Sequence, residues 1–354
     1  MTSSSQLAAM GTSPGAIMHH YDLSDDFFRI WLGPEMAYSC GLWDAADSQD
    51  SLDKAQIRKL DFFADRLGVA GGRVLDIGCG WGALLDRFVG VHRASSGVGL
   101  TLSPGQANFA GRRNLADVSY RLQNWTDHEP SDLYDAITCI EATEHFASDE
   151  LNPDEKVEVY RAFFERAASW LRPGGRMGLQ LICLDNVGHG ESRPGRGPFS
   201  DLILTDIFPE SMPASLSELV LGWETHFELD EFLDHPAHYQ RTFRAWTLAY
   251  REQEEDARAL VGPEVSRTYA RYFAAGEAAF RLREHSLYRV ILTRRPEPKI
   301  WAVTVRPSDV PTAAESVGEP AGAAGVGGEP AGVGGESAGA GAEAIRSHYD
   351  VSNA

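Results

Sequence analysis

The sequence lacks paired cysteines, long apolar runs and a surplus of basic residues, and each absence excludes a class of protein. Its four cysteines, Cys40, Cys79, Cys139 and Cys183, are far apart and form no C-x-x-C pair, which argues against a zinc site and a disulfide framework. No apolar run approaches the roughly 20 residues of a membrane-spanning helix. The Ser/Ala/Gly-rich start has no basic or apolar segment typical of a signal peptide. We therefore expect a cytoplasmic protein with no metal and no integral membrane association.

Acidic residues outnumber basic ones by 51 to 32, which gives a formal net charge of −19. Such a surplus repels nucleic acids and anionic membrane surfaces, so neither is an expected partner. The stretch from Val305 onward holds seven acidic residues and two arginines, and large apolar side chains nearly vanish there. This stretch is typical of a flexible linker.

Composition divides the 354 residues into four parts. We expect a disordered N-terminus (1–15), a folded domain (16–304), a disordered Gly/Pro/Ala/Glu linker (305–343) and a short terminal segment (344–354). Within the folded domain, 16–70 is predicted to be a helical cap, and 185–285 a substrate-side insertion followed by helices. The terminal segment repeats the pattern A-I-x-x-H-Y-D-[LV]-S-[DN] that begins at Ala16. It is either the start of a second unit in tandem or a segment that docks onto a neighbouring copy in a homo-oligomer.

Strands and helices alternate from Arg73 onward, which favours a parallel sheet with helices on both faces. Ser24 and Ser103 are predicted N-caps. The predicted strands are 73–77, 96–102, 118–122, 134–140 and 176–184, with two closing strands at 227–233 and 287–293. The predicted helices of the body are 52–67, 156–171, 241–260 and 264–282.

The most informative stretch is V-L-D-I-G-C-G-W-G-A-L-L, which begins at Val74. A short buried strand carrying Asp76 leads into alternate glycines, Gly78, Gly80 and Gly82, and then into a helix. Glycine lets the backbone approach a ligand closely, and the helix N-terminus directs N–H groups at it. The G-x-G-x-G spacing after an acidic strand end resembles the S-adenosylmethionine (SAM) sites of Rossmann-like methyltransferases.

Further motifs occur in a fixed order: H-Y-D-L-S-D-D-F-F, Y-S-C, V-G-L-T-L-S-x-x-Q, E-x-x-E-H-F, I-F-P and H-Y-x-R-T. With the glycine turn, they make the chain resemble the cyclopropane fatty acid synthase-like methyltransferases, which include the mycolic acid cyclopropane synthases. The resemblance covers roughly His19 to Arg295. It implies an α/β fold, a Rossmann-like seven-stranded SAM-dependent methyltransferase sheet with a helical cap.

The resemblance also implies which residues bind SAM. Asp76 would lie near the methionine end, Thr101 replaces the acid that nucleotide folds place near the ribose, and Trp125 would wall the adenine unless it is a plain core aromatic. The full set of implied cofactor residues is Tyr38, Ser39, Asp76, Gly78, Gly80, Gly82, Thr101, Leu102, Gln106, Asn124, Trp125 and Ile140.

The implied reaction transfers the SAM methyl group to an alkene carbon and passes through a carbocation. Proton loss then gives a cyclopropane or a methylated alkene. In the family a bound bicarbonate assists as base, and the matching residues here are Cys40, Glu144 and Tyr239, with Gln180 where the mycolate enzymes have His. Glutamine donates a hydrogen bond but cannot carry a proton at neutral pH. Taken alone, Cys40 and Tyr239 could be core residues, and Glu144 part of a helix cap.

The substrate wall differs from that of the lipid enzymes, because a Gly/Pro/Arg loop (188–198) replaces an apolar segment. This favours a smaller or more polar substrate. Arg193 and Arg196 would pair with an anionic group on it or remain solvated loop charges. The sequence thus predicts a SAM-dependent C-methyltransferase acting on an alkene of a lipid or specialised metabolite. The alternatives are a small-molecule N- or O-methyltransferase and a non-catalytic SAM-binding scaffold.

Overall fold

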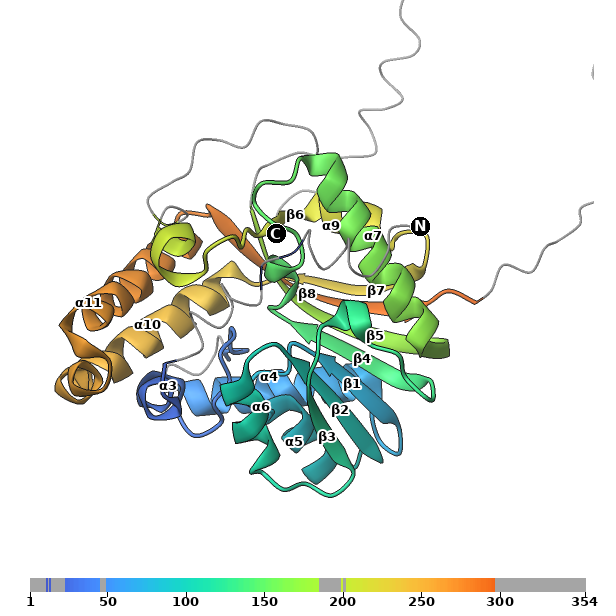
Figure 1. The fold of residues 1–354 in the computed structure, drawn as a ribbon, viewed down its shortest axis with the longest axis horizontal. Helices are drawn as coiled ribbons and strands as arrows, with labels where there is room; N and C mark the ends of the chain where they lie inside the picture. The colour runs from blue at the N-terminus through green and yellow to red at the C-terminus, as the bar shows by residue number, and fades with distance from the viewer. Residues whose placement is uncertain are drawn as a thin grey trace, which may run out of the picture. The chain divides into compact units, whose positions relative to one another are not determined.

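A mixed β-sheet forms the centre of the computed structural model, which describes residues 11, 13, 23–44, 49–184, 199 and 202–296 (Figure 1). In this part of the chain the sheet has eight strands, and seven of them follow the order β3-β2-β1-β4-β5-β8-β7. The strands are β1 (Arg73–Ile77), β2 (Ser96–Thr101), β3 (Val118–Leu122), β4 (Tyr134–Ile140), β5 (Leu171–Leu184), β6 (Ala214–Ser215), β7 (Phe227–Asp234) and β8 (His285–Arg294). The strands β1 to β5 pair in parallel, and β8 runs antiparallel between β5 and β7.

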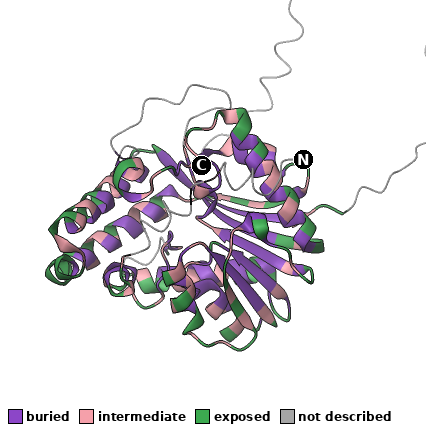
Figure 2. Ribbon diagram, viewed as in Figure 1, coloured by how far each residue is buried: buried purple, intermediate pink, exposed green. Residues whose placement is uncertain are grey.

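Buried strands explain why the sheet can carry helices on both faces. In β1, Leu75 and Ile77 pack into one apolar cluster while Val74 packs into another on the opposite face. A short strand that is apolar on both faces is the expected pattern for a covered parallel sheet. Figure 2 shows the same distribution, with buried residues along the strands and exposed ones on the outer sides of the helices.

Five of the eight α-helices in the described residues begin at a side chain that accepts a hydrogen bond from the first turn. Ser24, Ser51, Ser103, Asn152 and Ser215 each accept a hydrogen bond from the first turn, which confirms the predicted caps at Ser24 and Ser103. The α-helices of the described residues are α3 (Asp25–Leu32), α4 (Leu52–Leu67), α5 (Ala83–Gly90), α6 (Pro104–Gly111), α7 (Pro153–Trp170), α9 (Leu216–Trp223), α10 (Pro236–Glu252) and α11 (Glu254–Arg281).

Helices α4 and α5 lie against one face of the sheet, and α7 and α9 lie against the other (Figure 1). Helices α3, α10 and α11 pack together through aromatic side chains and form the cap. Their cluster includes Trp81, which follows the glycine turn, and Tyr239 of α10. The cap therefore lies beside the carboxyl ends of β1 and β4, where the strand order reverses and open α/β sheets bind their ligands.

Most predicted elements match the structure, and three differ. The predicted seven-stranded sheet gains the two-residue β6, which pairs with β5. Strand β5 begins at Leu171, because the pairing with β4 skips from Leu171 to Arg176 and the expected turn becomes an irregularity within one strand. The predicted break between the last two helices is only a kink at Gly262 (φ 79°), before Pro263, whereas the helices separate at Gln253.

The chain divides into two units, Met1–Lys299 and Ile300–Ala354, and every described residue belongs to the first. Apart from Gly11 and Ser13, the predicted disordered N-terminus (1–15) lies outside the described residues. Residues 16–22 of the first copy of the repeated motif, the linker (305–343) and the repeat itself (344–354) lie outside them too. Among the helices described, none is long and apolar enough to cross a membrane.

Candidate active site

The glycine turn after β1 brings two strand ends together. Gly78, Gly80 and Gly82 have φ angles of 77°, 53° and 85°, in the left-handed region that favours glycine. The N–H groups of Gly78 and Cys79 both donate to the carbonyl oxygen of Leu100 at the end of β2, at 2.9 Å. A Cβ atom on Gly78 would lie 2.4 Å from that of Ala142, so glycine is what allows the turn to meet the loop after β4.

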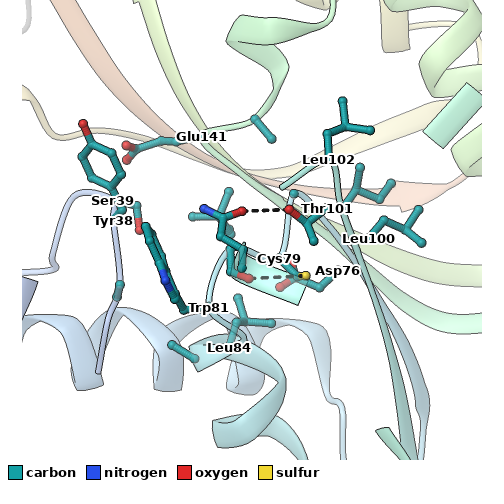
Figure 3. Close-up of a pocket in the computed structure, with 18 of the residues that line it drawn as sticks. Tyr38, Ser39, Asp76, Cys79, Trp81, Leu84, Leu100, Thr101, Leu102 and Glu141 are labelled. Atoms are coloured by element: carbon teal, nitrogen blue, oxygen red, sulfur yellow. Dashed lines mark hydrogen bonds between the residues drawn. The ribbon is translucent and has the colours of Figure 1, made fainter. Parts of the chain in front are cut away.

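A cavity of about 980 Å³, including its open mouth, lies over this turn. Eleven of the twelve sequence-predicted cofactor residues line it: Tyr38, Ser39, Asp76, Gly78, Gly80, Thr101, Leu102, Gln106, Asn124, Trp125 and Ile140. Gly82 does not line it, because that residue packs against the hydroxyl end of Tyr120. Figure 3 shows Tyr38 and Glu141 at one end of the cavity, with Leu100, Thr101 and Leu102 across from them.

Buried polar side chains give this cavity its chemistry. Asp76 accepts a hydrogen bond from Thr138 Oγ1 at 2.8 Å, and burial raises the pKa of its carboxyl group to about 6. At the end of the neighbouring strand β2, Thr101 Oγ1 donates to Gln106 Oε1 at 2.8 Å. Trp125 borders the cavity and also contacts Phe146 and Phe163 in the core, so its expected place beside the adenine stays a prediction.

A second cavity, of about 740 Å³ including its open mouth, adjoins the first and shares Tyr38, Glu141 and His145 with it. Its wall is rich in aromatic rings from the cap and the segment before β6: Tyr38, Phe199, Phe208, Tyr239, Phe243, Tyr272 and Phe280. Two carboxyl groups, of Glu141 and Glu144, border this apolar space. The predicted polar loop (188–198), with Arg193 and Arg196, lies outside the described residues.

Glu141 lies where the two cavities meet. Its carboxylate accepts hydrogen bonds from the Cys40 N–H at 2.9 Å, from Gln180 Nε2 at 2.6 Å and from the Tyr239 hydroxyl at 2.6 Å. Burial raises the pKa of Glu141, while these three donors and the charge of Lys59 oppose the shift. The residue has φ 51°, an uncommon angle for glutamate.

The sequence analysis assigned the acidic position of this group to Glu144. In the structure Cys40, Gln180 and Tyr239 meet on Glu141, and Glu144 instead accepts from the Ile182 N–H at 2.6 Å. Burial, together with the charge of Glu141, raises the pKa of Glu144 to about 8. The sequence signal that points to Glu141 is the pair of acids in E-x-x-E, because its first member directly follows β4.

Cys40 contributes its backbone N–H to the group around Glu141, and its side chain is a thiol, not a thiolate. Burial raises the pKa of its thiol to about 12, so the side chain stays protonated at neutral pH. Arg289 of β8 donates to the Cys40 carbonyl oxygen at 3.2 Å and to Gln180 Oε1 at 2.8 Å. The sequence analysis missed this fully buried arginine. Among the described residues, no group of three or more His, Cys, Asp or Glu side chains is arranged to hold a metal ion.

Comparison with known proteins identifies the family of this chain. The family described as mycolic acid cyclopropane synthetase matches residues 11–290. The chain is 34% identical over 280 residues to the cyclopropane mycolic acid synthase MmaA2 of Mycobacterium tuberculosis, covering 75% of this chain and 92% of that protein. The structure of MmaA2 from that organism superposes with a TM-score of 0.70 at 30% identity, over 80% of this chain and 99% of that one.

The mycolic acid cyclopropane synthase CmaA1, solved in complex with SAH and CTAB, also superposes with a TM-score of 0.70, at 29% identity and over 80% of this chain and 99% of that one. The fold, the cavity at the strand ends and the sequence likeness agree. The chain therefore belongs to the mycolic acid cyclopropane synthetase family and is a SAM-dependent methyltransferase of the cyclopropane synthase type.

Proposed function

We propose that this enzyme methylates an alkene carbon of a largely apolar lipid or specialised metabolite, and that Glu141 accepts the proton lost afterwards. The observation that carries the proposal is the position of the Glu141 carboxylate, held by three donors between the two cavities. The side chains around this carboxylate are mostly buried and many are aromatic, which suits a reaction that must exclude water.

The first cavity fits SAM. The turn at Gly78 lets a ligand approach the backbone, the Asp76 carboxyl group suits the α-ammonium of the methionine group, and Thr101 with Gln106 offers uncharged partners for a ribose. Bound SAM supplies an electrophilic methyl group that needs little activation. The remaining task of the chain is to hold the alkene in the second cavity, in line with that methyl group.

The aromatic wall of the second cavity suits a cationic intermediate on the substrate. The ring centroids of Tyr239, Phe243 and Phe280 lie 4.5 to 5.9 Å from one another, and all three rings border the cavity. The face of an aromatic ring attracts a cation, more strongly where water is excluded. The carboxylate of Glu141 adds a negative charge at the same border.

Glu141 also changes the expected role of bicarbonate. Cys40, Tyr239 and Gln180, the residues expected to hold that ion, donate to the Glu141 carboxylate instead. We therefore propose that a carboxylate of the chain takes the place of bicarbonate as the base. Proton loss from the new methyl group would close a cyclopropane, and loss from a neighbouring carbon would leave a methylated alkene.

Two experiments test this proposal, one on the substrate and one on the base. Purified enzyme is given isotopically labelled SAM with an alkene and with its saturated analogue, and product masses are measured. We expect label only in the alkene product; turnover of substrates that lack C=C would instead favour N- or O-methylation.

Removing bicarbonate from the buffer should leave the wild-type rate unchanged. Glu141→Gly, which suits the φ of 51°, should lose most activity and regain part of it with added bicarbonate. A wild-type rate that depends on bicarbonate would refute the role of Glu141 as base.

A further inference from the structure

Lys59 is a buried cation in the wall of the first cavity. It lies on α4 with 2% of its surface exposed, and its Nζ donates to Ser39 Oγ at 2.8 Å. Both side chains border the cavity, and none of the other described residues that line it is a lysine or arginine. A lysine is rarely buried without a negative partner.

The charges around Lys59 come from several elements. Asp76 of β1 and Glu141 after β4 favour its charged form, and Arg289 of β8 opposes it. Cys40 adds a favourable interaction only if it is ionised, and its raised pKa prevents that. Burial outweighs the favourable charges and lowers the pKa of Lys59 to about 8, so it is mostly charged at neutral pH.

The charges of the cofactor match this arrangement. The methionine group of SAM carries one anionic group, its α-carboxylate, beside the α-ammonium and the sulfonium. Asp76 can receive the ammonium, while Lys59 and the Ser39 hydroxyl supply N–H and O–H donors in the same cavity. We propose that Lys59, together with Ser39, binds the α-carboxylate of the cofactor's methionine group. This proposal rests on the proposed SAM site.

The alternative is that Lys59 only neutralises Asp76 and Glu141, and ligands that differ in one group separate the two roles. Binding of S-adenosylhomocysteine and of its decarboxylated analogue is measured by calorimetry for the wild type and for Lys59→Met. We expect Lys59→Met to weaken S-adenosylhomocysteine binding at least tenfold and to change binding of the decarboxylated analogue less than twofold. Equal weakening of both ligands, or no weakening, would overturn the assignment.

Controls keep this result specific. Lys54→Met, on the same helix but outside the cavity lining, should leave both affinities unchanged. Lys59→Gln keeps a polar side chain and should give the same selectivity should the methionine variant fail to fold. A wild-type protein that binds neither ligand would refute the SAM site itself, and with it both proposals.

The pH dependence provides a second readout. Because the pKa of Lys59 in the free protein is about 8, its charge is lost above that pH. For the wild type, we compare the association constant of S-adenosylhomocysteine with that of the decarboxylated analogue. The ratio of the first to the second should fall by up to tenfold per pH unit above about pH 8. In Lys59→Met this ratio should stay constant; a wild-type ratio that does not change with pH would contradict the proposal.

Discussion

Arg289 fixes the orientation of the Gln180 amide. The guanidinium Nε donates to Gln180 Oε1 at 2.8 Å, and both side chains are fully buried. Because a guanidinium only donates, the amide oxygen must face it and the amide nitrogen must point the other way. That nitrogen donates to Glu141 at 2.6 Å and to the Cys40 carbonyl oxygen at 3.0 Å. The arginine thus ensures that Glu141 meets a donor, which favours its ionised form.

The first prediction concerns Arg289→Met, which removes a donor shared by several buried acceptors. The carbonyl oxygens of Cys40 and Gly41 and the amide oxygen of Gln180 would each lose a partner. The Cys40 carbonyl keeps Gln180 Nε2 as a donor and the Gly41 carbonyl keeps the Cys40 thiol, so Gln180 Oε1 is the acceptor left unsatisfied. An unsatisfied buried acceptor costs about 1–3 kcal/mol, and each further hydrogen bond lost about 0.5–1.5 kcal/mol. We expect the free energy of unfolding in urea to fall by at least about 2 kcal/mol.

The control for this loss is Arg161→Met. Arg161 forms an exposed ion pair with Glu158 on α7, and such pairs contribute at most about 1 kcal/mol. An equally small effect of Arg289→Met would mean that the buried network is not needed for stability.

The second prediction concerns Tyr239→Phe, which removes the hydroxyl that donates to Glu141 at 2.6 Å. That bond stabilises the carboxylate and lowers its pKa, against the effect of burial. Without it the pKa of Glu141 rises, so the acidic limb of the pH–rate profile should move to higher pH. Activity at pH 6.5 should fall more than activity at pH 8.5. Tyr250→Phe, whose hydroxyl bonds Ser266 instead, should leave the profile in place; a shift in both variants would contradict this role.

The fold and the cofactor cavity could be predicted because their signals are local. The strands β1, β3 and β4 were predicted with the bounds that they have. Strands β1 and β4 are short and mostly apolar, and β3 (V-S-Y-R-L) alternates apolar and polar residues. The cavity residues at the strand ends follow directly from the strand positions. In a parallel sheet these ends meet at one edge, whatever the details of packing.

The proposed acid–base site was harder to predict, because it depends on contacts between distant segments. The choice between Glu141 and Glu144 depends on the φ of 51° at Glu141 and on the pairing of Ile140 with Gln180, which a sequence pattern does not contain. Lys59 and Arg289 were missed because charged residues usually face solvent. Lys59 lies on an amphipathic helix, whose basic positions are expected on its exposed face.

The third prediction tests the close approach at Gly78. In Gly78→Ala the new methyl group would meet Ala142 at 2.4 Å, next to Glu141, in addition to the cost of a positive φ. We expect the loop after β4 to shift and S-adenosylhomocysteine affinity, measured by calorimetry, to fall at least tenfold. Gly71→Ala has a similar φ of 72° but open space around the new atom, and it should keep its affinity. Similar affinities in both variants would show that the contact with Ala142 is unimportant.

The fourth prediction concerns the proton on Glu144. Burial and the charge of Glu141 raise the pKa of Glu144 from 4.5 to about 8, so between these pH values the folded state keeps a proton that the unfolded chain releases. The stability contributed by Glu144 is therefore full below about pH 4.5 and lost as the pH rises through about 8. Glu144→Gln keeps an oxygen to accept from Ile182 but does not titrate. Urea unfolding at pH 5, 6.5 and 8 should thus show the variant gaining stability relative to the wild type as the pH rises. A difference that is constant with pH would mean that Glu144 is ionised in the folded protein, and two adjacent carboxylates would then compete for the proton that Glu141 is proposed to accept.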